Sequence, residues 1–196
     1  ALLRPSDVVL DLGAGRGRAH LDDPVAYRRK LMDLRPRCAR VIGADVDPAV
    51  LDNPSVHEAR LIPTSGPGAF RLPLADGEAT LALCDHVLEH ISDPAAFAAE
   101  VARVLAPGGW FCARTPNRWG YVALAARAIP ERLHGAVLAR AQPHRKTEDV
   151  FPAFYRLNDR ASLRRAFPEA AWSHHVHLWN SEPAYAGGSA FAWRAG

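Results

Sequence analysis

Cysteine is scarce in this sequence, and the three residues present, Cys38, Cys84 and Cys112, are far apart. No Cys-x-x-Cys pair occurs, so neither a disulfide framework nor a cysteine-based zinc site is indicated. Two of the three fall in apolar, strand-like runs, where a free thiol acts as a small hydrophobic side chain. We therefore expect a reduced protein located in the cytoplasm.

Long apolar runs are also missing. No stretch approaches the roughly 20 residues that cross a bilayer, and the N-terminal residues lack the apolar core of a signal peptide. Internal repeats and low-complexity tracts are lacking too. Because the sequence does not begin with Met, we expect a processed or trimmed N-terminus, and we expect no membrane partner.

Apolar side chains, by contrast, are plentiful. Of the 196 residues, 48% are hydrophobic, and a chain of this length can bury a substantial core in one unit. We expect a single domain that spans residues 1–196.

The most informative stretch is Val8–Arg18, where an apolar strand leads directly into a glycine-rich turn. Residues 8–12 have the continuous apolar character of a central parallel strand, interrupted only by Asp11. The glycines that follow lack Cβ atoms, which permits positive φ and a close approach of a ligand to the backbone. Ligands of open α/β sheets bind at such carboxyl ends of strands. The candidate ligand-binding residues here are Asp11, Gly13, Ala14, Gly15 and Gly17.

A dinucleotide site would begin in the same way, but its third glycine should fall at position 18, where this chain has Arg18. A carboxylate at Asp11 would repel a pyrophosphate and attract an ammonium group. The stretch resembles the first motif of the class I S-adenosylmethionine-dependent methyltransferases. This resemblance implies S-adenosylmethionine as the cofactor. A nicotinamide-dependent oxidoreductase stays open as an alternative, as does a turn that only connects two elements.

A second buried strand also ends in a carboxylate. Residues 41–45 read as this strand, after a helix expected from Asp23 to about Leu34 with Leu31 and Leu34 facing the sheet. In a βαβ unit, an acid at the tip of the second strand points towards the ribose hydroxyls of a nucleoside bound at the first turn. Asp45 is therefore our strongest candidate for cofactor binding, with Val46 beside it. Asp47-Pro48 supplies a separate helix start.

Further segments resemble the same family, in the order that its fold requires. Leu72–Gly77 is similar to the turn before the fourth strand, Asp85–His90 to the family's Leu-Glu-His segment, and Glu100–Gly109 to the helix that ends in Pro-Gly-Gly. The resemblance covers residues 7–117 and implies that Cys84 and Asp85 lie at the cofactor edge. Two departures are present. Residues 68–71 contain no acid for the adenine amino group, and Ala79-Thr80 replaces the usual Phe-Asp pair.

The fold class implied is α/β, with a Rossmann-like, seven-stranded, mostly parallel sheet, helices on both faces and an antiparallel C-terminal strand. Further strands are expected at 56–62, 81–84 and 110–114, and helices at 94–105 and 159–167. A C-terminal hairpin is expected from strands at 172–179 and 189–194. The first of these contains His174, His175 and His177, but no carboxylate or cysteine lies close by. We read these histidines as packing residues and expect no metal.

Residues 118–157 are expected to form a substrate-binding insertion or lid over the carboxyl edge of the sheet. Residues 114–165 contain 11 Lys or Arg and 4 Asp or Glu, a net charge of +7, so the rest of this +3 chain carries about −4. Arginine forks bind carboxylates and phosphates bidentately, so we expect an anionic small-molecule acceptor. A solvated basic face is the alternative. The candidate substrate-binding residues are Asn117, Trp119, Tyr121, Arg145, Lys146 and Tyr155.

The reaction expected is methyl transfer from S-adenosylmethionine to a small-molecule nucleophile, with oxygen the methylated atom that the resemblance implies. Positioning supplies much of such catalysis, and a base has only to take the acceptor's proton. The candidate bases are His86 and His144, whereas His90 is read as structural. A nucleic-acid methyltransferase is a second alternative, although residues 85–88 lack the Asn/Asp-Pro-Pro-Tyr signature of enzymes that flip a base. A catalytically inactive cofactor-binding module is a third.

Overall fold

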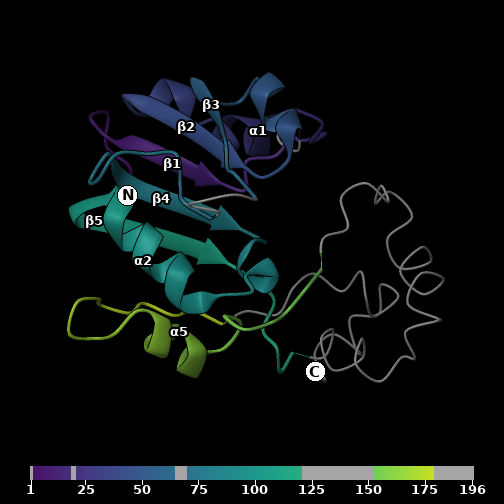
Figure 1. Ribbon diagram of the computed structural model, residues 1–196. Helices are drawn as coiled ribbons and strands as arrows, with labels where there is room; N and C mark the ends of the chain where they lie inside the picture. The colour runs from purple at the N-terminus through teal and green to yellow at the C-terminus, as the bar shows by residue number, and fades with distance from the viewer. Residues whose placement is uncertain (1, 19–20, 65–69, 121–151, 179–196) are drawn as a thin grey trace.

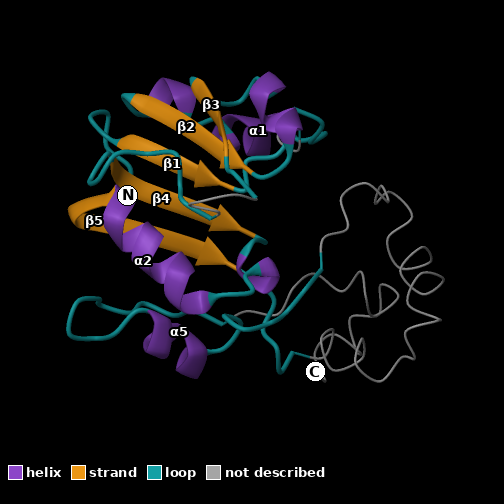
Figure 2. Ribbon diagram, in the orientation of Figure 1, coloured by secondary structure: helices purple, strands orange, loops and turns teal. Residues whose placement is uncertain are grey.

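The structure is a computed structural model, and it describes residues 2–18, 21–64, 70–120 and 152–178 of the chain. Its centre is a sheet of five strands in the order β3-β2-β1-β4-β5, and all neighbouring strands run parallel (Figures 1 and 2). The strands are β1 (Val8–Leu12), β2 (Arg40–Asp45), β3 (Glu58–Leu61), β4 (Ala79–Asp85) and β5 (Leu105–Arg114). The strand order reverses between β1 and β4, where open α/β sheets bind their ligands.

The described helices are short. They are α1 (Ala26–Met32), α2 (Pro94–Val104) and α5 (Arg160–Ala166), with 3₁₀ helices η1 (Arg35–Arg37), η2 (Pro48–Asp52) and η3 (Leu88–His90). Helix α2 matches its prediction: the Asp93 carboxylate accepts hydrogen bonds from Ala95 N and Ala96 N at 3.0 Å. Phe97, Val101 and Val104, at the spacing of one helix face, are fully buried.

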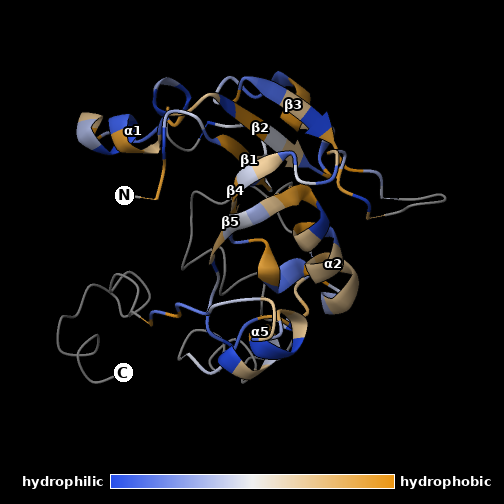
Figure 3. Cartoon of the chain, turned by 90° about the vertical axis from the view of Figure 1, so that its left-hand side faces the viewer, coloured by the Kyte–Doolittle hydropathy of each residue, from blue (hydrophilic) through white to orange (hydrophobic). Residues whose placement is uncertain are grey.

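The two faces of the sheet carry different cores, because neighbouring residues of a strand point to opposite sides. Leu10 and Leu12 belong to the larger core, which α2 and α5 cover. Val9 belongs to a smaller cluster on the other face, where Leu34 and Cys38 pack. Helices α1 and α2 lie on opposite sides of the sheet (Figure 3).

Helix α1 differs from its prediction in its start and in the side chains that it buries. It begins at Ala26, because the Asp23 carboxylate accepts from Val25 N and Arg28 Nε. None of its seven residues is buried, and Leu31 is 47% exposed. The prediction that Leu31 faces the sheet is therefore wrong, although Leu34, beyond the helix, does pack on the core.

The prediction of a strand at 172–179 is also wrong. Residues 172–178 form no strand, although they run beside β5, where the rings of Trp110 and His175 are 5.8 Å apart. The Nε2 of His174 lies 2.7 Å from Phe167 O. The strand expected at 189–194 lies outside the described residues. The sheet of the described chain is therefore five-stranded and parallel.

Candidate functional site

The glycine turn after β1 is fastened to the end of β2. Gly13 N donates to Ala44 O at 2.8 Å. Gly13, Gly15 and Gly17 have φ of +80°, +50° and +63°, in the left-handed region that favours glycine. A Cβ on Gly13 would lie 2.2 Å from Val87 Cγ2. The glycines are thus required both by backbone conformation and by the close approach of the loop after β4.

Asp45 lies directly against this turn. Its Oδ2 accepts from Gly15 N at 2.8 Å, and its Oδ1 accepts from Asp47 N at 2.9 Å. A carboxylate offers about four lone-pair sites, so both oxygens can accept further hydrogen bonds. The structure therefore joins Asp45 and the glycine turn, 30 residues apart in the sequence, as the βαβ interpretation predicted.

Two residues that sequence reasoning missed hold the turn from the other side. Asn53 is buried, and its Nδ2 donates to Ala14 O and Gly15 O, both at 3.0 Å. Ser55 Oγ donates to Gly17 O at 2.5 Å. The sequence around Pro54 is irregular, and it carries no periodic signal that could have linked it to a turn nearly 40 residues away.

Three carboxylates face one another at the carboxyl ends of β1, β2 and β4. Burial, together with the negative charges of Asp85 and Asp45, raises the pKa of Asp11 to about 6. Asp85 pairs with Arg114, whose Nε lies 2.6 Å from Asp85 Oδ1. In the described part of the chain, no Lys or Arg side chain forms an ion pair with Asp11. A ligand with a positive charge placed here would relieve the repulsion.

The remaining cofactor candidates lie around this cluster. The Cys84 side chain belongs to the hydrophobic core and is 1% exposed, and burial raises the pKa of its thiol. A cofactor could therefore meet Cys84 only at its backbone. Val46 follows Asp45 and is partly exposed.

His86 leaves β4 in an unusual conformation. Its φ is +56°, and its backbone N donates to Arg114 O at 2.8 Å. Its Nδ1 lies 3.3 Å from Glu89 Oε1, and its Nε2 lies 3.9 Å from Asp85 Oδ1. The hydrogen bond with Glu89 is the main cause that raises the pKa of His86 above its ordinary value.

Glu89 is a third residue that the sequence analysis did not single out. It is 6% exposed, and its Oε2 accepts from Thr115 Oγ1 at 2.8 Å. Burial by itself would raise the pKa of Glu89, but hydrogen bonds from His86, from its own backbone amide and from Thr115 hold it below the ordinary value. Glu89 is therefore a buried carboxylate, and its charge is stabilised by specific donors.

The structure describes three of the six predicted substrate residues. Asn117 and Trp119 line a cavity of about 790 Å³ between the end of β5, α5 and residues 172–178. The Trp119 side chain is stacked under the guanidinium of Arg118, 5.1 Å from the ring centre. Tyr155 has φ of +53°, and its N donates to Glu89 O at 3.1 Å. The other candidates, Tyr121, Arg145 and Lys146, and the candidate base His144 lie outside the described residues.

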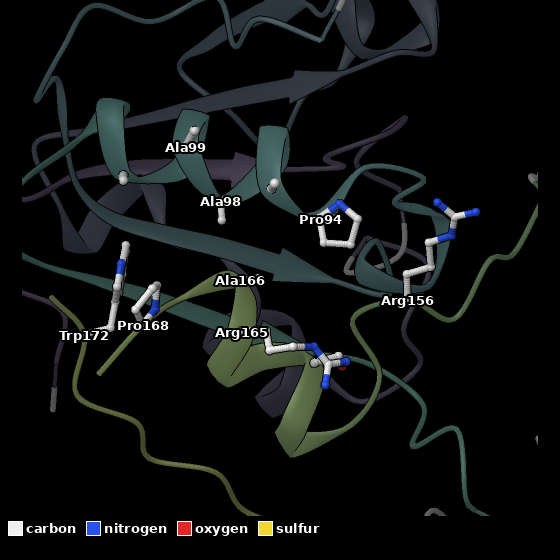
Figure 4. Close-up of a pocket in the computed structure, with 11 residues that line it drawn as sticks. Pro94, Ala98, Ala99, Arg156, Arg165, Ala166, Pro168 and Trp172 are labelled. Carbon is white, nitrogen blue, oxygen red and sulfur yellow. The ribbon is translucent and has the colours of Figure 1, made fainter. Parts of the chain in front are cut away.

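His90 occupies a position in keeping with a structural role, since its Nδ1 lies 2.8 Å from Pro152 O. A separate cavity of about 450 Å³ lies between α2 and α5 (Figure 4), and none of the predicted site residues lines it. Within the described ranges, no group of three His, Cys, Asp or Glu side chains could hold a metal ion. The described helices include none that is long and apolar enough to cross a membrane.

A parallel sheet, a glycine turn at the end of its central strand and an acid at the tip of the next strand together define a Rossmann-like α/β domain. A comparison with protein families identifies the family within this fold class. Residues 10–113, more than half of the chain, match the Methyltransf_11 family, described as a methyltransferase domain. The chain belongs to this family of class I S-adenosylmethionine-dependent methyltransferases, and its cofactor is S-adenosylmethionine.

Two curated relatives are similar to part of the chain. A probable S-adenosylmethionine-dependent methyltransferase of Mycolicibacterium smegmatis is 40% identical over 79 residues, which cover 40% of this chain and 30% of the relative. An uncharacterised protein in transposon TN4556 of Streptomyces fradiae is 33% identical over 108 residues, which cover 54% of this chain and 29% of the relative. The matched regions thus span less than a third of either relative.

Two solved structures are similar to part of the chain. YcgJ of Bacillus subtilis is 26% identical with a TM-score of 0.43, over 59% of this chain and 46% of that one. Geranyl diphosphate C-methyltransferase of Streptomyces coelicolor is 17% identical with a TM-score of 0.49, over 85% of this chain and 53% of that one.

Proposed function

We propose that this domain transfers a methyl group from S-adenosylmethionine to a small-molecule acceptor. The observation that carries the proposal is the set of three carboxylates, Asp11, Asp45 and Asp85, around the glycine turn. They disfavour a pyrophosphate and favour a ligand with a cationic tail. When bound, S-adenosylmethionine supplies an electrophilic methyl group on a positively charged sulfur.

The residues present fit such a cofactor. A Cβ built on Gly15 would have Asp45 Oδ2 as its nearest neighbour at 4.0 Å, so the space beside this part of the turn is open. Asp45 would accept hydrogen bonds from the ribose hydroxyls, and Asp11, which has no ion-pair partner among the described residues, would attract the positive charge. The backbone of residues 13–17, Val46 and the backbone of Cys84 would complete the contacts.

The residues at the end of β4 can provide the proton transfer. The acceptor, with oxygen as the proposed nucleophilic atom, loses its proton to a base while the methyl group moves to it. Bound S-adenosylmethionine would supply the methyl group and leave as neutral S-adenosylhomocysteine. His86 lies beside Asp85, at the cofactor edge, and is the described candidate for this base. His144 is the alternative.

An anionic acceptor remains our proposal for the substrate class, and its support is the +7 charge of residues 114–165. Two of these arginines form ion pairs with carboxylates within the fold. Arg114 pairs with Asp85, and Arg118 pairs with Asp159 at 3.2 Å. We propose that Arg145 and Lys146, which lie outside the described residues, bind the acceptor's charge.

We expect S-adenosylhomocysteine to raise the melting temperature of the protein, because a ligand that binds only the folded state stabilises it by mass action. NAD is expected to leave the melting temperature unchanged, since Arg18 replaces the third fingerprint glycine and Asp11 repels a pyrophosphate. Thermal unfolding with each compound measures both effects. Stabilisation by NAD alone would favour the oxidoreductase alternative and contradict the proposed methyl transfer.

Replacing Arg145 and Lys146 together by alanine is expected to raise the Michaelis constant for the acceptor at least tenfold, on the order of 1.4 kcal/mol, with cofactor affinity unchanged. The acceptor is first sought by release of S-adenosylhomocysteine with pools of host metabolites. The matched control is Arg164→Ala, since Arg164 is exposed and pairs only with exposed Glu169 in the described structure. Normal turnover by the double variant at low and high salt would make the basic segment a solvated face. Steep salt dependence of RNA binding would favour the nucleic-acid alternative.

A further inference from the structure

The buried carboxylate of Glu89 connects three parts of the fold. Glu89 itself lies in η3, directly after β4. Its Oε2 accepts a hydrogen bond from the hydroxyl of Thr115, which follows β5. Its backbone carbonyl oxygen accepts a hydrogen bond from Phe154 N at 2.7 Å. A buried carboxylate is costly unless donors surround it. The number of donors gathered on Glu89 therefore shows that the surroundings are built to keep its charge.

Asn158, Thr115 and Glu89 form a chain of hydrogen bonds, and the chemistry of these groups determines which one donates in each bond. Asn158 is 2% exposed, and its Nδ2 donates to Thr115 Oγ1 at 2.5 Å and to Pro116 O at 3.1 Å. The Thr115 hydroxyl thus accepts from Asn158 and donates its only proton to Glu89 Oε2. Because Asn158 Nδ2 is only a donor to Thr115, the Thr115 hydroxyl cannot donate to Asn158. If it rotated away from Glu89, its hydrogen bond to Glu89 would be lost.

The other oxygen of Glu89 determines the state of His86. An ionised carboxylate is an acceptor only, so a hydrogen bond between Glu89 Oε1 and His86 Nδ1 requires the proton on Nδ1. In the neutral imidazole, Nε2 then carries the lone pair. Nε2 lies 3.9 Å from Asp85 Oδ1, so the free lone pair is on the side of the ring that faces the cofactor edge.

The backbone of His86 supports this arrangement independently. A φ of +56° is uncommon for a residue with a side chain and costs free energy, so the surrounding structure must impose it. The hydrogen bond from His86 N to Arg114 O does so at one end. The residue is thus held at two points: its backbone by the end of β5 and its ring by Glu89.

We propose that Glu89, clamped by Thr115 and Asn158, is a positioning residue that holds His86 in the Nδ1-protonated tautomer with Nε2 free to take the acceptor's proton. This inference rests on the proposed function for its catalytic meaning. The tautomer itself, however, is a property of the protein and can be measured without any acceptor. Three charged groups face His86: Glu89 and Asp85 raise its pKa, and Arg114 lowers it.

The experiment is NMR spectroscopy of the full chain labelled with ¹⁵N-histidine, titrated with pH. His86→Gln identifies the His86 signals. The expected result is a neutral His86 with its proton on Nδ1 and a titration midpoint above the ordinary histidine value. In Glu89→Gln the midpoint is expected to fall and the tautomers to mix, because the charge that selects Nδ1–H is removed.

A second pair of variants tests the clamp and guards against misfolding of Glu89→Gln. Thr115→Val removes the hydroxyl and should lower the His86 midpoint, whereas Thr115→Ser keeps the hydroxyl and should restore it. A predominantly Nε2-protonated His86 in the wild type would overturn the proposal. So would a midpoint that stays the same in both Glu89→Gln and Thr115→Val. Calorimetry with S-adenosylhomocysteine distinguishes failure of the proposed function from failure of the tautomer proposal. Absence of binding by the wild type would contradict the proposed function but would not affect the tautomer result.

Discussion

Asp45→Ala is expected to weaken binding of S-adenosylmethionine about a hundredfold, on the order of 3 kcal/mol. Hydrogen bonds to a charged group are worth roughly 1.5 to 3 kcal/mol each, and the proposed ribose contacts would lose them. The structure adds a second cause. Asp45 Oδ2 also accepts from Gly15 N at 2.8 Å, so the variant releases the turn on which the cofactor is proposed to bind.

Asp47→Ala is the matched control for this measurement. The Asp47 carboxylate accepts from Ala49 N at 2.9 Å and caps η2, and its link to the glycine turn among the described residues is a 3.9 Å ion pair with the Arg16 side chain. Removing it deletes a neighbouring negative charge and a cap but leaves the contact between Asp45 and Gly15 in place. Calorimetric titration of both variants decides the question. A dissociation constant that is unchanged in folded Asp45→Ala would remove Asp45 from the site.

The parts of the fold that could be predicted from the sequence are those that local chemistry determines. Strand β1 is an uninterrupted apolar run apart from Asp11, which suits a strand buried on both faces. The start of α2 follows from Asp93-Pro94, a cap followed by a residue that needs no N–H partner. Helix α5 likewise begins after Asp159, whose Oδ1 accepts from Ser162 N at 2.7 Å. Such signals lie within a few residues of the element they specify.

The elements that were mispredicted depend on distant partners. Residues 172–178 have the alternation of a strand, yet a strand exists only where a neighbour accepts its ladder hydrogen bonds, and sequence pattern cannot supply that neighbour. Helix α1 was placed too early because the Asp23 carboxylate binds Arg28 as well as the backbone. The local pattern could not distinguish this ion pair from a helix cap.

The sequence pointed to the glycine turn and the acids beside it, whose role in cofactor binding stays a prediction, but it did not point to the residues that support them. Asn53 and Glu89 act across 38 and 26 residues, on Gly15 and Thr115 respectively. Asn53 lies in no motif, and the Leu-Glu-His segment that contains Glu89 gives no local sign of the contact with Thr115. Thr80 shows the same point. It departs from the family's Phe-Asp pair, but its hydroxyl lies 2.9 Å from Asp7 Oδ1 and accepts from Val8 N at 3.1 Å. The departure is therefore matched by a polar contact at the start of β1.

Asp11→Asn is expected to stabilise the folded protein at neutral pH. The pKa of Asp11 is raised from 3.8 to about 6 in the fold, so ionising it costs about 3 kcal/mol, at 1.36 kcal/mol for each unit. Below pH 3.8 the side chain is neutral in both states, and there is no cost. Stability is lost as pH rises from 3.8 to about 6 and stays reduced above that. Urea unfolding should therefore show the variant more stable than the wild type at pH 7.5 and equally stable at pH 3.5.

The same substitution is expected to oppose cofactor binding, because the repulsion that destabilises the free protein is what a positive ligand relieves. S-adenosylmethionine carries a sulfonium charge that S-adenosylhomocysteine lacks, so Asp11→Asn should weaken the first more than the second. For the wild type, affinity for S-adenosylmethionine should rise with pH up to about 6, as Asp11 loses its proton. Calorimetry with both ligands at pH 5 and pH 7.5 measures these differences. Equal losses for the two ligands, or a variant no more stable than the wild type at pH 7.5, would show that the charge of Asp11 is compensated within the protein and is not held for a cation.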